Sequence, residues 1–237
     1  MALPKLTTPT YELEVPSTDE KIKYRPFLVK EEKILLIAME SGEQESIVAA
    51  IKDIVTECTY GKVDLGSIPM FDVEYIFLQI RSKSVGEIST LRLLCPDDKE
   101  TYVNVDVDLS EVAVHVDKGH NPKIELTEEM GMIMTYPTID SLTGIDGADI
   151  NASNMLDVIG SCILQIYDKK GEEVFDAKDQ TKKELTEFVE QLNTKQFEEV
   201  QKFFDTMPKL KHTIEVENPK TKVKSKIVLQ GLNDFFE

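Results

Sequence analysis

Apolar residues follow a helical period most clearly between residues 67 and 86, where they lie on two sides of the predicted helix. At about 100° per residue, the first side carries Val73, Ile76, Phe77 and Ile80. The nearly opposite side carries Phe71, Tyr75 and Leu78. A helix with two apolar sides packs against two neighbours, so we expect it either in the core or between its own domain and another chain.

The residues that flank this helix predict where it begins and ends. Ser67 is a favourable N-cap, and Pro69 is tolerated in a first turn because the N–H groups there have no intrahelical partner. Gly86 suits a left-handed cap at the other end. The predicted helix therefore has a definite start and stop.

Two further helices are expected before it, over residues 30–39 and 43–58, with Gly42 between them. The second helix has one apolar face, formed by Ile47, Ile51, Ile54, Val55 and Cys58. A cysteine on such a face behaves as a small hydrophobic residue, so Cys58 is expected in the core and not in catalysis.

After Gly86 the apolar period changes from 3.6 to 2, which predicts a β-hairpin over about 91–109 with its turn at 96–100. A third strand is expected at 112–116 and a fourth at 124–126. Residues 130–136 are apolar and precede Pro137, a pattern that fits either a buried strand or a short helix.

The later part of the chain predicts helices and then a second hairpin. A polar loop over 140–151 leads into a helix on which Met155, Ile159, Cys162 and Ile166 line up with Leu156, Ile163 and Tyr167. Thr181 and Glu184 form a capping box, and Thr194 is expected to cap the next helix. Alternating residues over 210–216 and 223–229 predict the C-terminal hairpin.

These elements indicate an α+β fold, with a helical body around the two-faced helix and antiparallel β-hairpins in the middle and at the C-terminus. We expect an extended N-terminal arm over 1–26, which holds four prolines. The main α+β domain is expected over 27–208, with a β-hairpin insertion at about 89–126. The C-terminal β-hairpin and an aromatic tail take up 209–237.

Charge and cysteine content narrow the class of protein. The chain holds 44 Asp and Glu against 27 Lys and Arg, a net charge of −17, which disfavours nucleic acid and anionic membranes. Three cysteines far apart indicate a reducing compartment, and no apolar run is long enough for a membrane span. Lysines gather on the C-terminal hairpin, where they either prevent edge-to-edge pairing or bind phosphate or an acidic neighbour.

Recognisable chemistry is missing from the sequence. It holds no glycine-rich phosphate loop, no nucleophile elbow and no zinc-protease motif, and the histidines His115, His120 and His212 have no catalytic pattern around them. We therefore expect no enzymatic activity, no catalytic residues, no cofactor and no metal. The alternative from another class is a hydrolase with an unrecognised carboxylate site.

Three stretches resemble the baseplate hub protein family of T4-like contractile-tailed phages, and the similarity spans most of the chain. The first is Phe71-Asp72-x-Glu74-x-x-Phe77-Leu78-x-x-Arg81-x-x-Ser84-x-Gly86-Glu87. The others are the opening Leu28-Val29-Lys30-Glu31-Glu32-Lys33 and the ending Gly231-Leu232-x-Asp234-Phe235-Phe236.

The resemblance implies a subunit or assembly factor of the baseplate hub that binds other hub or tail proteins. Its place would be the host cytoplasm during assembly, and the tail baseplate of the virion if it is a permanent subunit. A transient assembly chaperone, absent from the mature virion, is the alternative, and the acidic charge favours it. Candidate partner-binding residues are Phe71, Tyr75, Leu78, Leu232, Phe235 and Phe236.

The resemblance also implies that the hairpins are similar to zinc ribbons, which carry paired cysteines at their turns. Here only Cys95 lies at the first turn, and the second turn, around Asn218-Pro219, has no cysteine. Four thiolate or imidazole ligands cannot be assembled from these residues. The hairpins are therefore expected to be ribbon-like but metal-free.

Overall fold

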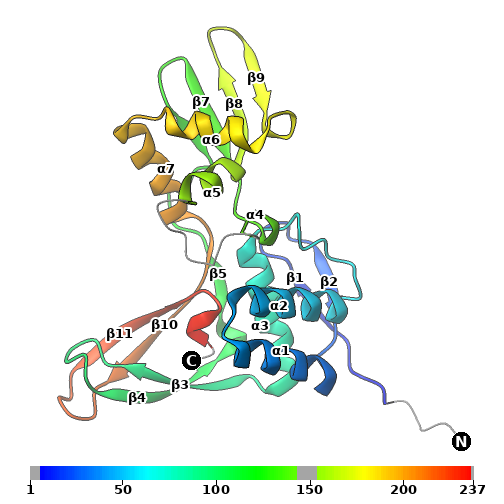
Figure 1. The fold of residues 1–237 in the computed structure, drawn as a ribbon. Coiled ribbons are helices and arrows are strands. Elements are labelled where there is room, and N and C mark those ends of the chain that lie inside the picture. The colour runs from blue at the N-terminus through cyan, green and yellow to red at the C-terminus, as the bar shows by residue number, and fades with distance from the viewer. Residues whose placement is uncertain (1–5, 143–153, 236–237) are drawn as a thin grey trace, which may run out of the picture. The chain divides into compact units, whose positions relative to one another are not determined.

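The computed structural model describes residues 6–142 and 154–235 (Figure 1). These residues form two compact units. Unit 1 combines the chain before Val116 with the chain after Pro208, and unit 2 is the continuous segment between them. Helices and small antiparallel sheets occur in both units, so the predicted α+β class is confirmed. Most of the polar loop predicted over 140–151 lies outside the described residues.

Unit 1 begins with a two-stranded antiparallel hairpin followed by three helices. The elements are β1 (Tyr11–Glu14), β2 (Lys21–Tyr24), α1 (Val29–Ser41), α2 (Gln44–Cys58) and α3 (Met70–Val85). The β1–β2 turn is attached to α3, because Asp72 Oδ1 accepts a hydrogen bond from the Ser17 backbone N–H at 3.1 Å. The Ser17 hydroxyl donates to the other oxygen of the same carboxylate. The segment predicted as an arm thus forms a hairpin held by its own unit.

Helix α3 is the central element of unit 1, as the two-sided pattern predicted. It packs on α2 and also on the strands β5 and β10. Its first apolar side is fully buried at Val73, Ile76 and Ile80, and the second side is buried at Phe71 and Leu78. Both faces therefore belong to the core.

The ends of α3 differ from the prediction. The helix begins at Met70 with Pro69 as its N-cap, while Ser67 donates its hydroxyl hydrogen bond to Asp64 in the preceding turn. The prediction of Ser67 as N-cap is therefore wrong. Gly86 follows the last helical residue, but its φ of 135° and ψ of 155° are not those of a left-handed cap, so this prediction is also wrong. Its positive φ still favours glycine.

Two antiparallel ribbons complete unit 1. The first is β3 (Ile88–Leu94) with β4 (Tyr102–Asp108), and the second is β10 (Lys209–Glu217) with β11 (Lys224–Gln230). The short turns η1 (Leu109–Glu111) and η4 (Asn233–Phe235) follow β4 and β11. The ribbons bury one face each, through Leu91, Cys95, Val107, Ile214, Val216 and Leu229.

The third and fourth strands predicted after the middle hairpin form, but they do not extend it. Strand β5 (Ala113–His115) pairs with β10 of the second ribbon, and β6 (Lys123–Glu125) pairs with β7 in unit 2. The expectation that these strands add to one hairpin insertion is therefore wrong. Period-2 patterning locates a strand but does not say which neighbour it pairs with.

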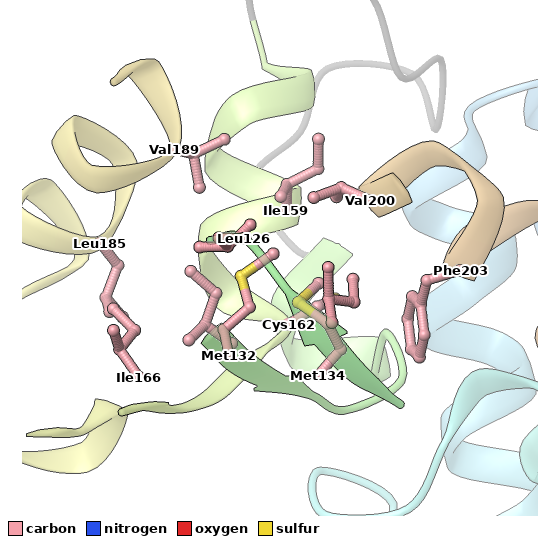
Figure 2. Packing of buried hydrophobic residues seen from close by; sticks show 12 residues of the cluster. Leu126, Met132, Met134, Ile159, Cys162, Ile166, Leu185, Val189, Val200 and Phe203 are labelled. Atoms are coloured by element: carbon pink, nitrogen blue, oxygen red, sulfur yellow. The ribbon is translucent and has the colours of Figure 1, made fainter. Parts of the chain in front are cut away.

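Unit 2 is a four-stranded antiparallel sheet with helices packed on it. The strand order is β6-β7-β8-β9, with β7 at Met130–Met134, β8 at Ile163–Asp168 and β9 at Glu173–Asp176. The helices are α4 (Ile139–Leu142), α5 (Met155–Ser161), α6 (Lys182–Glu190) and α7 (Thr194–Thr206), with the turn η3 at Ala177–Asp179. Figure 2 shows their shared core, in which Met132 and Met134 of the sheet lie between Leu185 of α6 and Phe203 of α7.

Four expectations for unit 2 are now resolved. Residues 130–134 form a strand, which decides between the two interpretations of that segment. The helix expected to run through Tyr167 ends at Ser161, and the residues after it form β8, so its predicted length is wrong. Ile163, Ile166 and Tyr167 are residue types that favour strands, and β8 pairs on both sides. The capping box of Thr181 with Glu184 is confirmed, whereas Asn193, not Thr194, caps α7.

No helix among residues 6–142 and 154–235 is long and apolar enough to cross a bilayer.

Candidate protein-binding surface

The first turn of helix α1 is anchored by one buried carboxylate, that of Glu31. Glu31 receives a hydrogen bond from the Leu28 backbone N–H at 2.7 Å, which satisfies a donor at the start of the helix. Its other oxygen pairs with Arg25 Nη2 at 2.9 Å. Burial alone would raise the pKa of Glu31, but the hydrogen bonds from Arg25 and Leu28 outweigh it and lower that pKa. The Glu31 carboxylate is therefore charged, and in this form it holds the first turn of α1.

Beyond Glu31, little of α1 is buried. The helix packs on α2, and among its residues only Glu31 and Ala38 are classed as buried. Val29 is 79% exposed, Leu36 is 54% exposed and Ile37 is 56% exposed. Ile34 and Met39 also belong to the exposed large apolar residues. Helix α1 thus presents apolar side chains to solvent around most of its circumference.

We call this surface the α1 face, formed by Val29, Lys33, Ile34, Leu36, Ile37, Met39 and Glu40. A surface helix normally carries polar residues on the side away from the core, and a helix that is apolar all round is normally buried. Clustered exposed apolar side chains on a folded protein mark a binding surface, whereas single ones need no explanation. The α1 face is accordingly the candidate protein-binding site.

An uninterrupted apolar run in the sequence indicates this surface, although such a run has no helical period. Residues 34–39 are six consecutive apolar residues within a predicted helix. Six consecutive positions cover more than one full turn of 3.6 residues, so they cannot all face one side. An apolar run longer than a turn, on a helix with one packing partner, leaves part of the run exposed.

The partner-binding residues proposed from the sequence lie elsewhere. Phe71, Leu78, Leu232 and Phe235 are buried within unit 1, and Tyr75 is half-buried. Phe236 lies outside the described residues. These side chains contribute to the core of unit 1, and a partner-binding role for them remains a prediction.

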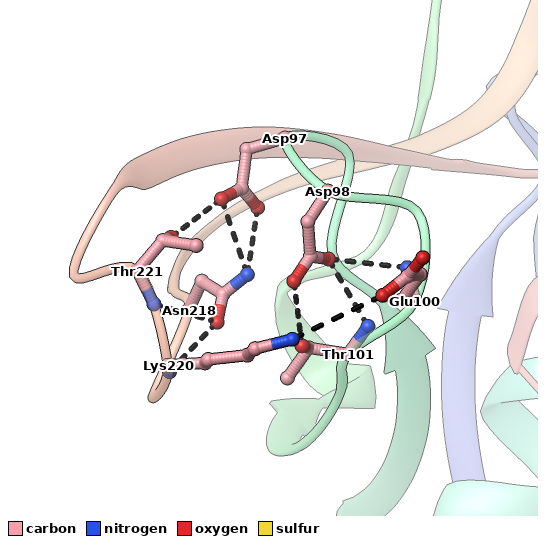
Figure 3. A network of polar contacts seen from close by, with 7 residues as sticks. All are labelled: Asp97, Asp98, Glu100, Thr101, Asn218, Lys220 and Thr221. Carbon is pink, nitrogen blue, oxygen red and sulfur yellow. Dashed lines mark hydrogen bonds and ion pairs between the residues drawn. The ribbon is translucent and has the colours of Figure 1, made fainter.

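A polar cluster joins the tips of the two ribbons of unit 1 (Figure 3). The buried Asn218 donates its amide hydrogens to both oxygens of Asp97, at 3.0 and 3.1 Å. Thr221 adds a hydroxyl hydrogen bond to Asp97 at 2.5 Å. These hydrogen bonds lower the pKa of Asp97. The first turn is held separately, because Asp98 accepts hydrogen bonds from the hydroxyl and backbone N–H of Thr101.

The ribbon tips thus meet through hydrogen bonds. Cys95 is buried beside the first turn, where its backbone N–H donates to the Thr101 carbonyl at 2.8 Å. Within the part of the chain that the structure describes, no group of three or more His, Cys, Asp or Glu side chains could hold a metal ion.

Unit 2 holds a half-buried polar group of a different kind. His120 hydrogen-bonds through Nδ1 to the Thr206 hydroxyl and through Nε2 to the Tyr136 hydroxyl, both at 3.0 Å. Its ring also lies 5.0 Å from the ring of Phe203. Burial lowers the pKa of His120, with Asp117 opposing the shift. Both ring nitrogens hydrogen-bond to side chains of unit 2, so His120 has a structural role there.

The polar clusters in the described residues hold elements of this protein together. Its most distinctive surface is the apolar α1 face, which is typical of a protein that binds other proteins. A family model described as T4 bacteriophage base plate protein matches residues 8–237, and the chain belongs to this family. The comparison of the chain with curated proteins found no match, and neither did the comparison with solved structures. Membership confirms the resemblance to baseplate proteins of T4-like phages, which are tail components in contact with other tail proteins.

Proposed function

We propose that this protein is a subunit or assembly factor of the baseplate hub, and that it acts through protein–protein contacts and not as an enzyme. The observation that carries the proposal is the α1 face. A baseplate protein has many protein neighbours, and an apolar surface of this kind is stabilised when a neighbour covers it.

The composition of the α1 face supports a protein partner. Its apolar residues are large, and Lys33 and Glu40 add one charge of each sign. Protein interfaces combine an apolar centre with a polar rim in this way. A surface that bound nucleic acid would instead concentrate positive charge, whereas this chain has a net charge of −17.

Two forms of the proposal differ in how long the contact lasts. A permanent subunit remains in the virion, whereas an assembly chaperone shields its client and then leaves. The net charge of −17 favours the chaperone, because a strongly charged protein stays soluble while it carries an apolar client surface. The two forms predict different locations for the chain in finished particles.

The experiment compares purified particles with a pull-down from infected-cell lysate, both analysed by mass spectrometry. Three forms of the chain are used: wild type, Ile37→Glu and Val174→Glu. Ile37 lies on the α1 face, and Val174 lies on β9 of unit 2 with a similar exposure, 61% against 56%. Each change adds the same charge at an exposed apolar position, so the second variant controls for charge and folding.

We expect the wild type and Val174→Glu to be recovered with hub proteins, and Ile37→Glu to be recovered at least tenfold less. Recovery in particles as well identifies a subunit, and recovery in lysate alone identifies an assembly chaperone. Equal recovery of all three forms would remove the α1 face as the contact surface. Absence of the wild type from both samples would overturn the hub proposal.

A further inference from the structure

We infer that the α1 face binds the α1 face of a second copy of this chain, with the two helices antiparallel. The inference rests on the proposal that the α1 face is a contact surface, and it names the occupant. It comes from the placement of the charged and apolar residues along α1.

The charges on the α1 face are spaced for an antiparallel pair. Lys33 and Glu40 are seven residues apart, so they lie on the same side of the helix within about 20°. They are also equally distant from the midpoint between Leu36 and Ile37. A two-fold axis at this midpoint brings Lys33 of one copy beside Glu40 of the partner subunit, and it does so twice.

The opposite orientation lacks this match. In a parallel pair, like residues lie beside each other, so Lys33 would approach Lys33 of the partner subunit and the two Glu40 carboxylates would approach each other. Like charges at such spacing destabilise a helix pair, whereas opposite charges stabilise it. The order of charges along α1 therefore selects the antiparallel arrangement.

The apolar residues fit the same axis. Leu36 and Ile37 lie at the centre of the pair, where the two helices approach most closely, with Ile34 and Met39 on either flank. An isologous contact needs one patch that is complementary to itself. The α1 face meets this requirement, because its apolar centre meets an apolar centre and each charge meets its opposite.

The length of α1 limits the expected affinity of the dimer. Thirteen residues give a helix about 20 Å long, and a single helix pair of this length buries less than the standard interface of about 1,600 Å². We expect a reversible dimer with a dissociation constant in the micromolar range, on the order of 10⁻⁶ to 10⁻⁴ M. Such a dimer forms readily when many copies gather at one assembly site.

The first test is sedimentation velocity of the purified full chain from about 5 to 500 μM, at about 0.15 M salt. The weight-average sedimentation coefficient should rise with concentration for the wild type and for Val174→Glu. Ile37→Glu should weaken the association at least tenfold. Circular dichroism of each variant checks that its helix content is unchanged.

The second test uses the charges. Lys33→Glu alone places like charges at both crossings of its homodimer, and so does Glu40→Lys alone, so each should weaken the dimer about tenfold. Mixing the two variants makes a heterodimer in which opposite charges meet at both crossings. The mixture should therefore associate more tightly than either variant alone, as expected if these positions lie at the contact. The weakening by each single change is what distinguishes the antiparallel register, since in a parallel pair like charges already meet in the wild type.

The outcomes separate this inference from the proposed function. A wild-type sedimentation coefficient that is constant with concentration overturns the inference, as does a dimer that Ile37→Glu leaves intact. Single charge variants that associate as tightly as the wild type overturn the antiparallel register. If the wild type is monomeric and Ile37→Glu still loses the hub proteins in the lysate pull-down, another tail protein covers the α1 face; the proposed function then holds and the inference fails.

Discussion

Glu74 is a single residue whose pKa depends on the packing of the C-terminal segment against α3. It lies on α3, beside the backbone of Gly231 and Leu232, and burial raises its pKa from the ordinary 4.5 to about 7, with the Leu232 N–H opposing the shift. Gly231 has a φ of 69° and donates its N–H to the Leu210 carbonyl at 3.0 Å, which turns the chain toward α3. Between about pH 4.5 and 7, the folded protein therefore holds a proton on Glu74 that the unfolded chain releases.

Replacing Glu74 by Gln should remove a pH-dependent destabilisation. Because the folded pKa of Glu74 is above the unfolded value, the folded state binds more protons between pH 4.5 and 7, and the free energy of unfolding falls as pH rises through that range. The full loss above pH 7 is on the order of 3 kcal/mol. Glu74→Gln should flatten this slope and be more stable than the wild type at pH 8, as measured by urea unfolding at several pH values.

The control for this prediction is Glu20→Gln, at an exposed position in the turn between β1 and β2. It should leave the pH slope of the wild type unchanged. If Glu74→Gln keeps the wild-type slope, the buried carboxyl is not the origin of the pH dependence.

For single residues, the sequence predicted burial better than it predicted hydrogen-bond partners. Cys58 was expected in the core and is fully buried there. Glu31 and Asp72 could not be recognised as buried anchors, because their partners Arg25 and Ser17 lie on other elements. A carboxylate in a sequence shows its charge but not the donors that the fold brings to it.

Among the elements, the two ribbons of unit 1 are joined by hydrogen bonds between their tips. Asn218 is fully buried, donates to Asp97 and accepts backbone hydrogen bonds from Lys220 and Thr221. It therefore shapes its own turn and also joins the second ribbon to the first. A residue with both roles should be sensitive to even small substitutions.

We expect Asn218→Ala to lower the free energy of unfolding by about 2 kcal/mol, since it leaves buried polar groups without partners. Asn218→Asp should be more destabilising at neutral pH, because it places a second carboxylate beside Asp97, and part of the loss should be recovered as the pH is lowered toward 4. Thermal unfolding across this pH range measures both effects.

Asn104→Ala, at an exposed position on β4, is the matched control for the asparagine change. It should stay within about 0.5 kcal/mol of the wild type. If Asn218→Asp is no less stable than Asn218→Ala at any pH, the contact with Asp97 does not determine the effect of the substitution.

Element types followed from the sequence where one pattern dominated a segment. The two-sided helix, the middle hairpin and the C-terminal hairpin were all predicted from their own periods. Strand β8 was not, because Ile163 and Ile166 also fit the helical spacing that begins at Met155, and only pairing with β7 and β9 makes them a strand. The exposure of α1 had the same origin, since the number of neighbours that a helix has is decided by the fold.

For the whole molecule, the division into two units gives a prediction about independent folding. Unit 2 is one continuous segment, and its core contains residues of its own sheet and helices, from Ile124 to Phe203. The fragment 116–208 should therefore fold alone and unfold cooperatively when heated. The same fragment with Val200→Asp, which places a carboxylate in this core, should show no cooperative transition. An intact fragment without a transition would contradict the assignment of unit 2 as a folding unit.

Unit 1 has no such independence, because its last ribbon is separated from the rest by the whole of unit 2. On the ribosome, β3, β4 and β5 emerge early, but β10 and β11 follow only after unit 2 has been translated, about 5 to 20 s later at ordinary rates of synthesis. During that interval the inner faces of β3 and β4 lack their cover. A nascent chain that stalls before residue 209 therefore presents incomplete sheet edges to its surroundings, and translation of the final hairpin is the step that closes the first unit.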